Sequence, residues 1–246
     1  MAAPSRSRSS ERAAAGPSHS RVTRGGAPVK LGAVSAVIFD LDGVLLESEQ
    51  VWSAAKRDLS LEHGGVWTVG AERDMLGMSS GEWSRYMRQE LRVPLQAAEI
   101  SASVAELVAS RYRRDLPLIA GADSAVRTLA ERHPLGLASS SNRQTIDLVL
   151  DLTDWASRFS ATTSSEEVAA GKPEPDVYVE TARRLDVSPA VCVAVEDSDV
   201  GIRSACAAGI AVVAIPNRAY PPAADVLSRA DLVLESISGL AVAIDG

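Results

Sequence analysis

The sequence predicts an α/β fold in which a doubly wound parallel sheet carries a helical cap inserted after its first strand. Three observations predict it. Short apolar runs without in–out alternation, which are typical of strands covered on both faces, recur along the chain. Amphipathic helical patterns separate most of these runs. A stretch of about 70 residues between the first run and the second shows helical patterns alone, and a simple crossover is far shorter.

Each strand candidate is a short apolar run. The first is Ala36–Phe39, which reads AVIF. The later ones are Leu135–Ala138, Phe159–Thr162, Val191–Val195, Ala211–Ile215 and Leu232–Leu234. Helices are expected between most of them, over Asp123–Arg132, Thr145–Leu152, Asp176–Leu185 and Asp199–Ala208. This alternation predicts a Rossmann-like core made of residues 31–48 and 118–246.

The long interval predicts a separate helical cap over residues 49–117. Its first helix ends at Gly64 and Gly65, after apolar residues at helical spacing: Val51, Trp52, Ala55 and Leu59. A second amphipathic stripe consists of Ile100, Val104, Leu107, Val108 and Tyr112. Because the interval follows the first strand directly, we expect it to cover the carboxyl end of that strand as a lid.

Charge is distributed unevenly along the 246 residues. Residues 1–30 carry six basic side chains and one acidic, a net charge of +5, whereas the remainder carries 19 basic and 31 acidic, a net charge of −12. The basic segment lacks bulky apolar residues, so we expect a disordered tail. Its composition also resembles an organelle transit peptide, with a solvated extension or a misassigned start codon as alternatives. The acidic body argues against nucleic-acid binding.

Other features bound the class of protein. No apolar run approaches the ~18 residues of a membrane span, so no membrane partner is expected. Two cysteines, Cys192 and Cys206, cannot form a disulfide framework and lack zinc-ligand spacing. These observations favour a cytoplasmic protein, and we expect a monomer.

Polar residues gather where the predicted strands end. Asp40 and Asp42 follow the first strand, three serines at 139–141 follow the second, and Glu196 and Asp197 follow the fourth. Lys172 lies in the polar turn GKPEPD after the third. Since ligands of open parallel sheets bind outside the carboxyl ends of the strands, these side chains are candidates for one site.

This set of residues suits phosphoryl transfer. A carboxylate can attack phosphorus, but it repels a phosphate by about 5 kcal/mol per pair of unit charges at ~3.5 Å and an effective dielectric of ~20. A divalent cation and a lysine offset that repulsion. Asp40, Glu196 and Asp197 offer hard oxygen ligands suited to Mg²⁺, and Lys172 adds a second positive charge.

Each feature alone has a simpler interpretation. Serines at positions 139–141 would be an ordinary strand-to-helix turn, and Lys172 a solvated loop lysine. Glu196 and Asp197 would cap the following helix. The order of the features, each at a strand end, favours the functional interpretation.

The segments FDLDGVLLESE, LASSS, GKPEPDVY and VEDSDVGI together resemble the four motifs of the haloacid dehalogenase superfamily, in its group with a helical cap. The resemblance implies that Asp40 is the nucleophile and Asp42 the general acid and base. It implies phosphate contacts by Ser139, Ser140 and Lys172. It also implies Mg²⁺ held by Asp40, Glu196, Asp197 and the main-chain carbonyl of Asp42.

The expected function is a Mg²⁺-dependent phosphatase that hydrolyses a small phosphorylated metabolite, such as a sugar phosphate, through an aspartyl-phosphate. One alternative is a sugar-phosphate mutase similar to β-phosphoglucomutase. Trp52 stands where that mutase has a histidine, which argues against it. A non-catalytic interaction protein is the other alternative. Phosphonatases of the superfamily use a cap lysine, but Lys56 is expected to be a surface lysine of its helix.

Overall fold

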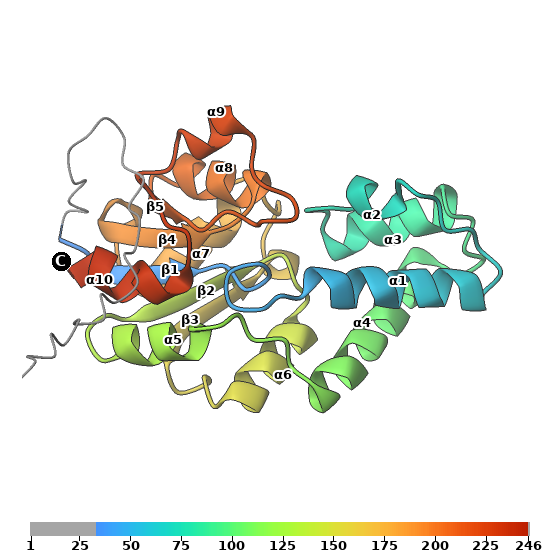
Figure 1. The fold of residues 1–246 in the computed structure, drawn as a ribbon, viewed down its shortest axis with the longest axis horizontal. Helices are drawn as coiled ribbons and strands as arrows, with labels where there is room; N and C mark the ends of the chain where they lie inside the picture. The colour runs from blue at the N-terminus through green and yellow to red at the C-terminus, as the bar shows by residue number, and fades with distance from the viewer. Residues whose placement is uncertain (1–32, 246) are drawn as a thin grey trace, which may run out of the picture.

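The computed structural model describes residues 33–245 of the chain. Within them six parallel strands form one sheet in the order β3-β2-β1-β4-β5-β6, which confirms the doubly wound prediction (Figure 1). The strands are β1 Ala36–Phe39, β2 Leu135–Ser139, β3 Phe159–Ser164, β4 Cys192–Glu196, β5 Ala211–Ala214 and β6 Leu232–Val233. The chain winds outward from β1 to β3 and then returns to β4, so β1 and β4 meet at the switch point where such sheets bind ligands.

Helices cover both faces of the sheet. On one face lie α5 Ala122–Ala130, α6 Arg143–Thr153 and α10 Leu240–Asp245, and on the other α7 Asp176–Arg184, α8 Asp199–Ala207 and the short α9 Ala224–Leu227. Alternate residues of β1 serve the two cores: Val37 and Phe39 pack on the first face, Ala36 and Ile38 on the second. All four are fully buried, which explains why the strand shows no polar alternation.

Four helices follow β1 and form a helical insert, which lies beside one end of the sheet (Figure 1). They are α1 Glu49–Glu62, α2 Ala71–Asp74, α3 Ser80–Gln89 and α4 Ala97–Arg114. Helix α4 packs against both α1 and α3. Its buried side, which includes Ile100, Val104 and Val108, is the apolar stripe read from the sequence.

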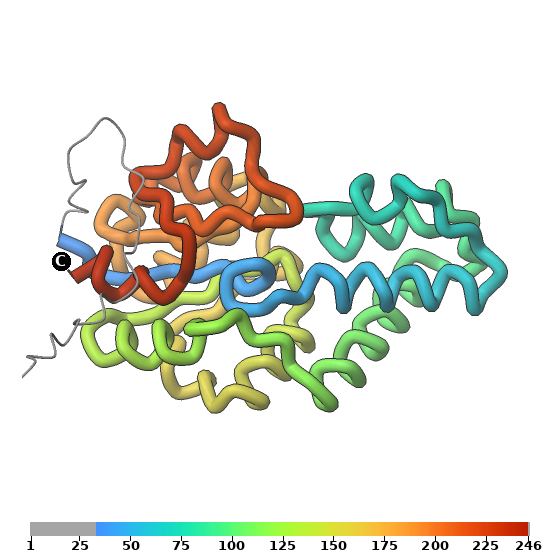
Figure 2. Tube along the Cα trace, in the orientation of Figure 1, coloured from blue at the N-terminus to red at the C-terminus, as the bar shows by residue number. Residues whose placement is uncertain are grey.

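The insert joins the core through two connections that pair with each other. The main-chain N–H of Glu47 donates to the carbonyl of Pro117 at 2.8 Å, and that of Ile119 donates to the carbonyl of Leu45 at 3.0 Å. Leu46 and Leu118 form an antiparallel bridge between these bonds. The entering and leaving segments therefore run side by side as a two-stranded ribbon (Figure 2).

Three predictions from the sequence concern the tail, a membrane span and the cysteines. The predicted tail, residues 1–30, lies outside the described residues, so its disorder stays a prediction. No helix within residues 33–245 is long and apolar enough to cross a membrane. In the same range both cysteines are free thiols, Cys192 buried and Cys206 half-buried.

Candidate active site

The carboxyl ends of β1 and β4 bring four acidic side chains together. Asp40 follows β1 directly, and its main-chain N–H donates to the carbonyl of Val195 in β4 at 3.0 Å. Glu196 ends β4 and Asp197 follows it, while Asp42 lies in the turn after β1. Asp40, Glu196 and Asp197 are each buried. Neighbouring parallel strands therefore place these groups side by side, as the strand-end argument predicts.

Lys172 lies at the centre of this group. Its ammonium donates to Asp40 Oδ1 at 2.8 Å and to Glu196 Oε1 at 2.6 Å. The side chain is 3% exposed, so the solvated loop lysine considered from the sequence is excluded. Burial lowers the pKa of Lys172, but the two carboxylates more than compensate and raise it above its ordinary value. Lys172 is thus a permanent cation beside Asp40.

Glu196 is held at both of its oxygens. Oε1 accepts from the phenol of Tyr178 at 2.7 Å as well as from Lys172. Oε2 accepts from the main-chain N–H of Asp197 at 3.1 Å. A Cβ at Gly201, in the first turn of α8, would lie 2.0 Å from this carboxylate. The glycine therefore lets the helix approach the buried acid closely.

The acidic cluster could hold a cation. One oxygen from each of Asp40, Glu196 and Asp197 lies within 4.8 Å of the others, and all three oxygens are hard ligands. Burial, against the opposing charge of Lys172 and with added repulsion from Glu196 and Asp42, raises the pKa of Asp40 to about 7. Burial, Glu196 and Asp40 also raise the pKa of Asp197 well above its ordinary value. The cluster thus holds three buried carboxyl groups against one lysine, and this imbalance contributes to the raised pKa values.

The loop after β1 approaches the Asp197 carboxylate closely at Gly43. Gly43 has φ +86°, a left-handed conformation that side chains disfavour. A Cβ built on Gly43 would lie 1.9 Å from Asp197 Oδ2. Only glycine permits this approach, which sets the position of the Asp197 carboxylate relative to the loop that carries Asp42.

The three serines at the end of β2, residues 139–141, differ from one another in burial and in hydrogen bonding. The hydroxyl of Ser141 donates to Asp42 Oδ2 at 2.6 Å, whereas Oδ1 of Asp42 is buried without a hydrogen-bond partner among the described residues. Ser139 is fully buried, and its Oγ accepts from the main-chain N–H of Ser141 at 3.0 Å. Ser140 lines the cavity described next. All three lie at the same sheet edge as Asp40.

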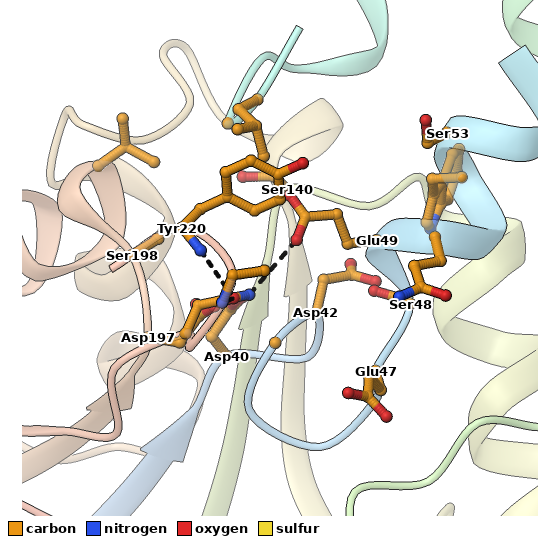
Figure 3. A pocket seen from close by; sticks show the side chains of 18 of the residues that line it. Asp40, Asp42, Glu47, Ser48, Glu49, Ser53, Ser140, Asp197, Ser198 and Tyr220 are labelled. Atoms are coloured by element: carbon orange, nitrogen blue, oxygen red, sulfur yellow. Dashed lines mark hydrogen bonds between the residues drawn. The ribbon is translucent and has the colours of Figure 1, made fainter. Parts of the chain in front are cut away.

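A cavity of about 850 Å³ opens above the carboxylates (Figure 3). Core residues such as Asp40 and Asp197 line one part of it, and the helical insert lines another through Trp52, Lys56 and Trp83. The expectation that Lys56 is a surface lysine is wrong, because it belongs to the cavity wall. Its position one helical turn after Trp52 on α1 turns both side chains toward the cavity.

Two contacts of the cluster were not singled out from the sequence. Asn217 follows β5, and its amide donates to Asp197 Oδ2 at 3.4 Å and to Glu49 at 3.5 Å. It too is a polar residue just beyond a strand end, so the same rule could have found it. Tyr178 stands in the quoted segment GKPEPDVY, but nothing in the spacing indicates a bond to Glu196.

Comparison with known proteins decides the family. The family model described as haloacid dehalogenase-like hydrolase matches residues 34–209. The chain is a haloacid dehalogenase-like hydrolase. This family membership confirms the resemblance read from the four motifs.

The hydrolase is similar to several proteins that are named as phosphatases. It is 33% identical over 189 residues to hexitol phosphatase B of Escherichia coli strain K12, covering 74% of the chain and 84% of that protein. It is 29% identical over 205 residues to the bifunctional riboflavin kinase/FMN phosphatase of Arabidopsis thaliana, covering 82% of the chain. The match spans only 53% of the Arabidopsis protein, about half of its length. These relatives place the hydrolase among the phosphatases of its family.

The fold comparison agrees. The crystal structure of CbbY from Rhodobacter sphaeroides, solved in complex with phosphate, superimposes with a TM-score of 0.75 at 25% identity. The match covers 87% of this hydrolase and all of the CbbY chain. The α/β architecture with its helical insert is therefore shared with a phosphate-binding relative.

Proposed function

We propose that this hydrolase removes phosphate from a small sugar or polyol phosphate, with Mg²⁺, through an aspartyl-phosphate on Asp40. The observation that carries the proposal is the buried group of Asp40, Lys172, Asp197 and Glu196, the first three of which line a large cavity. It combines a nucleophile, a fixed cation and a set of hard ligands. The similarity to hexitol phosphatase B supports the substrate class.

Asp40 attacks phosphorus, and the bond from phosphorus to the ester oxygen breaks. Lys172 holds Asp40 Oδ1 at 2.8 Å, so the carboxylate is oriented before the substrate arrives. Its positive charge also offsets the repulsion between Asp40 and the phosphate. Ser139 and Ser140, at the end of β2, are the proposed contacts of the phosphate oxygens.

Asp42 acts as the general acid and then as the general base. It gives a proton to the departing alkoxide, which leaves as an alcohol, and then takes a proton from the water that attacks the aspartyl-phosphate. The products are inorganic phosphate and free Asp40. The hydrogen bond from Ser141 at 2.6 Å holds one oxygen of Asp42, and the unpartnered Oδ1 is available for the proton.

The ligand set fits Mg²⁺. Asp40, Glu196 and Asp197, together with the main-chain carbonyl of Asp42, would hold it, in keeping with its preference for carboxylate oxygens and substrate phosphate. When bound, the cation neutralises negative charge on the phosphate and on the carboxylates. The excess of buried carboxylates over Lys172 is the feature that calls for it.

We further propose that residues 49–117 are a cap domain over a core of residues 31–48 and 118–246. The insert lines the cavity, and the two chain segments that connect it to the core pair with each other at Glu47 and Pro117. A cap of this kind excludes bulk water while a small phosphorylated metabolite reacts. The monomeric state and cytoplasmic location stay predictions.

Phosphate release from a panel of phosphorylated metabolites, with Mg²⁺ and with EDTA, tests the proposal. We expect Mg²⁺-dependent release that is lost in Asp40→Asn, while circular dichroism shows the same fold. Asp151→Asn, which alters an exposed carboxylate of α6, is the matched control and should retain activity. Borohydride reduction of enzyme quenched during turnover should convert Asp40 to homoserine, which identifies the acyl-phosphate. Substantial turnover by Asp40→Asn would overturn the mechanism.

The same assay separates the mutase alternative. A mutase passes the phosphoryl group to a second hydroxyl of the sugar, so it forms an isomeric sugar phosphate and no free phosphate. Formation of glucose 6-phosphate from β-glucose 1-phosphate without phosphate release would establish that activity. Trp52, which lies in the cavity wall, is the residue that argues against it.

A further inference from the structure

The insert side of the cavity carries a lysine that the proposed mechanism does not use. Lys56 Nζ lies 5.0 Å from the ring centroid of Trp83 and 6.0 Å from that of Trp52. It forms no hydrogen bond or ion pair with any residue in the described range. The two aromatic faces therefore stabilise its charge through cation–π attraction, and its N–H groups remain available to a ligand.

Two carboxylates face the same part of the cavity. Glu49 begins α1 and Glu72 lies in α2, and both line the cavity. Burial and the nearby charge of Glu72 raise the pKa of Glu49, so the two acids are close enough to repel each other. Neither reaches Lys56 within ion-pair distance among the described residues. Among the described residues the carboxylate of Glu49 accepts a single hydrogen bond, a long one of 3.5 Å from Asn217.

The charge balance of the cavity disfavours a second anion. Among the described residues its lining includes eight carboxylates and three cations, Lys56, Lys172 and Arg218. Lys172 is committed to Asp40 and Glu196, and Arg218 is exposed to solvent, which screens it. At the insert end, therefore, Glu49 and Glu72 outnumber Lys56.

We propose that this wall selects leaving groups that carry hydroxyls and no second negative charge. Glu49 and Glu72 accept hydrogen bonds from substrate hydroxyls and repel a second phosphate or a carboxylate. Lys56 donates to a neutral oxygen of the same leaving group, and Trp52 and Trp83 form the apolar surface beside it. The substrate class is therefore the monophosphates of sugars or polyols, and bisphosphates and phosphorylated acids are rejected. This inference rests on the proposed phosphatase activity.

The dimensions of the cavity set the size of the effect. A sphere of 850 Å³ is about 12 Å across, which gives the scale of the separation between charges on opposite sides of the cavity. Two unit charges at ~12 Å and an effective dielectric of ~20 repel by about 1.4 kcal/mol, which is a factor of ten in affinity. We therefore expect a preference of about tenfold in kcat/KM for a monophosphate over the matching bisphosphate.

A matched substrate pair tests the inference: a hexitol 6-phosphate and the corresponding 1,6-bisphosphate, assayed with Mg²⁺ by phosphate release. Glu72→Gln keeps an acceptor oxygen and removes the charge, so the preference for the monophosphate should shrink several-fold. Lys56→Met removes the cation at similar volume, so the preference should widen and KM for the monophosphate should rise. Glu62→Gln, at the exposed end of α1, is the control and should leave the ratio unchanged.

The opposite directions of the two variants distinguish a charge effect from a structural one, because general loosening of the insert would move both ratios the same way. A wild-type preference for the bisphosphate, or a ratio that Glu72→Gln leaves unchanged, would overturn the inference while the phosphatase activity stands. Failure to release phosphate from any ester would overturn the proposed function, and the inference with it.

Discussion

Gly43→Ala tests whether the loop after β1 positions the proposed metal ligand Asp197. The new Cβ would start 1.9 Å from Asp197 Oδ2, and real Cβ atoms keep at least 3.0 Å from such a neighbour, so the carboxylate oxygen must retreat by at least 1.1 Å. Misplacement of a reacting group by ~1 Å costs about 100-fold in rate. Loss of metal-site positioning costs about 10- to 100-fold in metal affinity. We expect losses of this size in kcat/KM and in Mg²⁺ affinity.

Gly64→Ala is the matched control. Gly64 also has a left-handed backbone, with φ +73°, but no atom lies within 4 Å of the Cβ that it would gain. Both substitutions therefore incur a similar backbone strain of about 1–2 kcal/mol, which urea denaturation measures. Only Gly43→Ala also displaces a carboxylate. Gly64→Ala should stay within about twofold of wild-type activity.

The assay is phosphate release as a function of Mg²⁺ concentration for both variants and the wild type. Equal activity and equal Mg²⁺ affinity in the two variants would refute the reasoning, since the contact between Gly43 and Asp197 would then have no effect on the site. A loss in Gly43→Ala that high Mg²⁺ restores would indicate weakened metal binding rather than a misplaced nucleophile.

Further outcomes concern the same cluster. Tyr178→Phe removes the 2.7 Å hydrogen bond to buried Glu196, so the free energy of unfolding measured in urea should fall by about 1.5–3 kcal/mol. A decrease below ~0.5 kcal/mol would contradict this. Ser141→Ala frees Asp42 and should slow hydrolysis of alkyl phosphates about tenfold, while aryl phosphates, whose leaving groups need little protonation, should change less. In EDTA the folded protein keeps Asp40 protonated up to its pKa of about 7, whereas the unfolded chain loses that proton near 3.8. Thermal stability should therefore fall as pH rises from about 4 to about 7, and a profile unchanged by Asp40→Asn would argue against it.

The strand arrangement could be predicted because the sheet is covered on both faces. Strand β1 begins and ends at the predicted residues, and β2 and β4 extend one residue further into the polar turns that follow them. Parallel pairing of β1 with β4 then brings Asp40 and Glu196 together without any information beyond strand ends. The sequence contains this part of the site because local pattern and sheet geometry determine it.

The cavity wall could not be predicted in the same way. Lys56 is one polar residue on an amphipathic helix, and the pattern of α1 does not say which structure faces its polar side. That side meets the core only because the insert folds back over the strand ends. The bond from Tyr178 to Glu196 depends likewise on packing of α7 against the sheet, a tertiary contact with no local signature.

The paired connections at Glu47 and Pro117 mark the boundary between the core, which carries Asp40 and Lys172, and the insert, which lines the cavity. A hydrogen bond of 2.8 Å holds the two connecting segments together there. The two ends of any insert therefore start from the same short separation, whatever its sequence. The entropy of closing a loop grows only slowly with its length, so a longer or shorter insert adds little cost. A different insert grafted onto the same ribbon would leave Asp40 and Lys172 in place. The bond-breaking machinery and the choice of ester can therefore evolve, or be exchanged, independently.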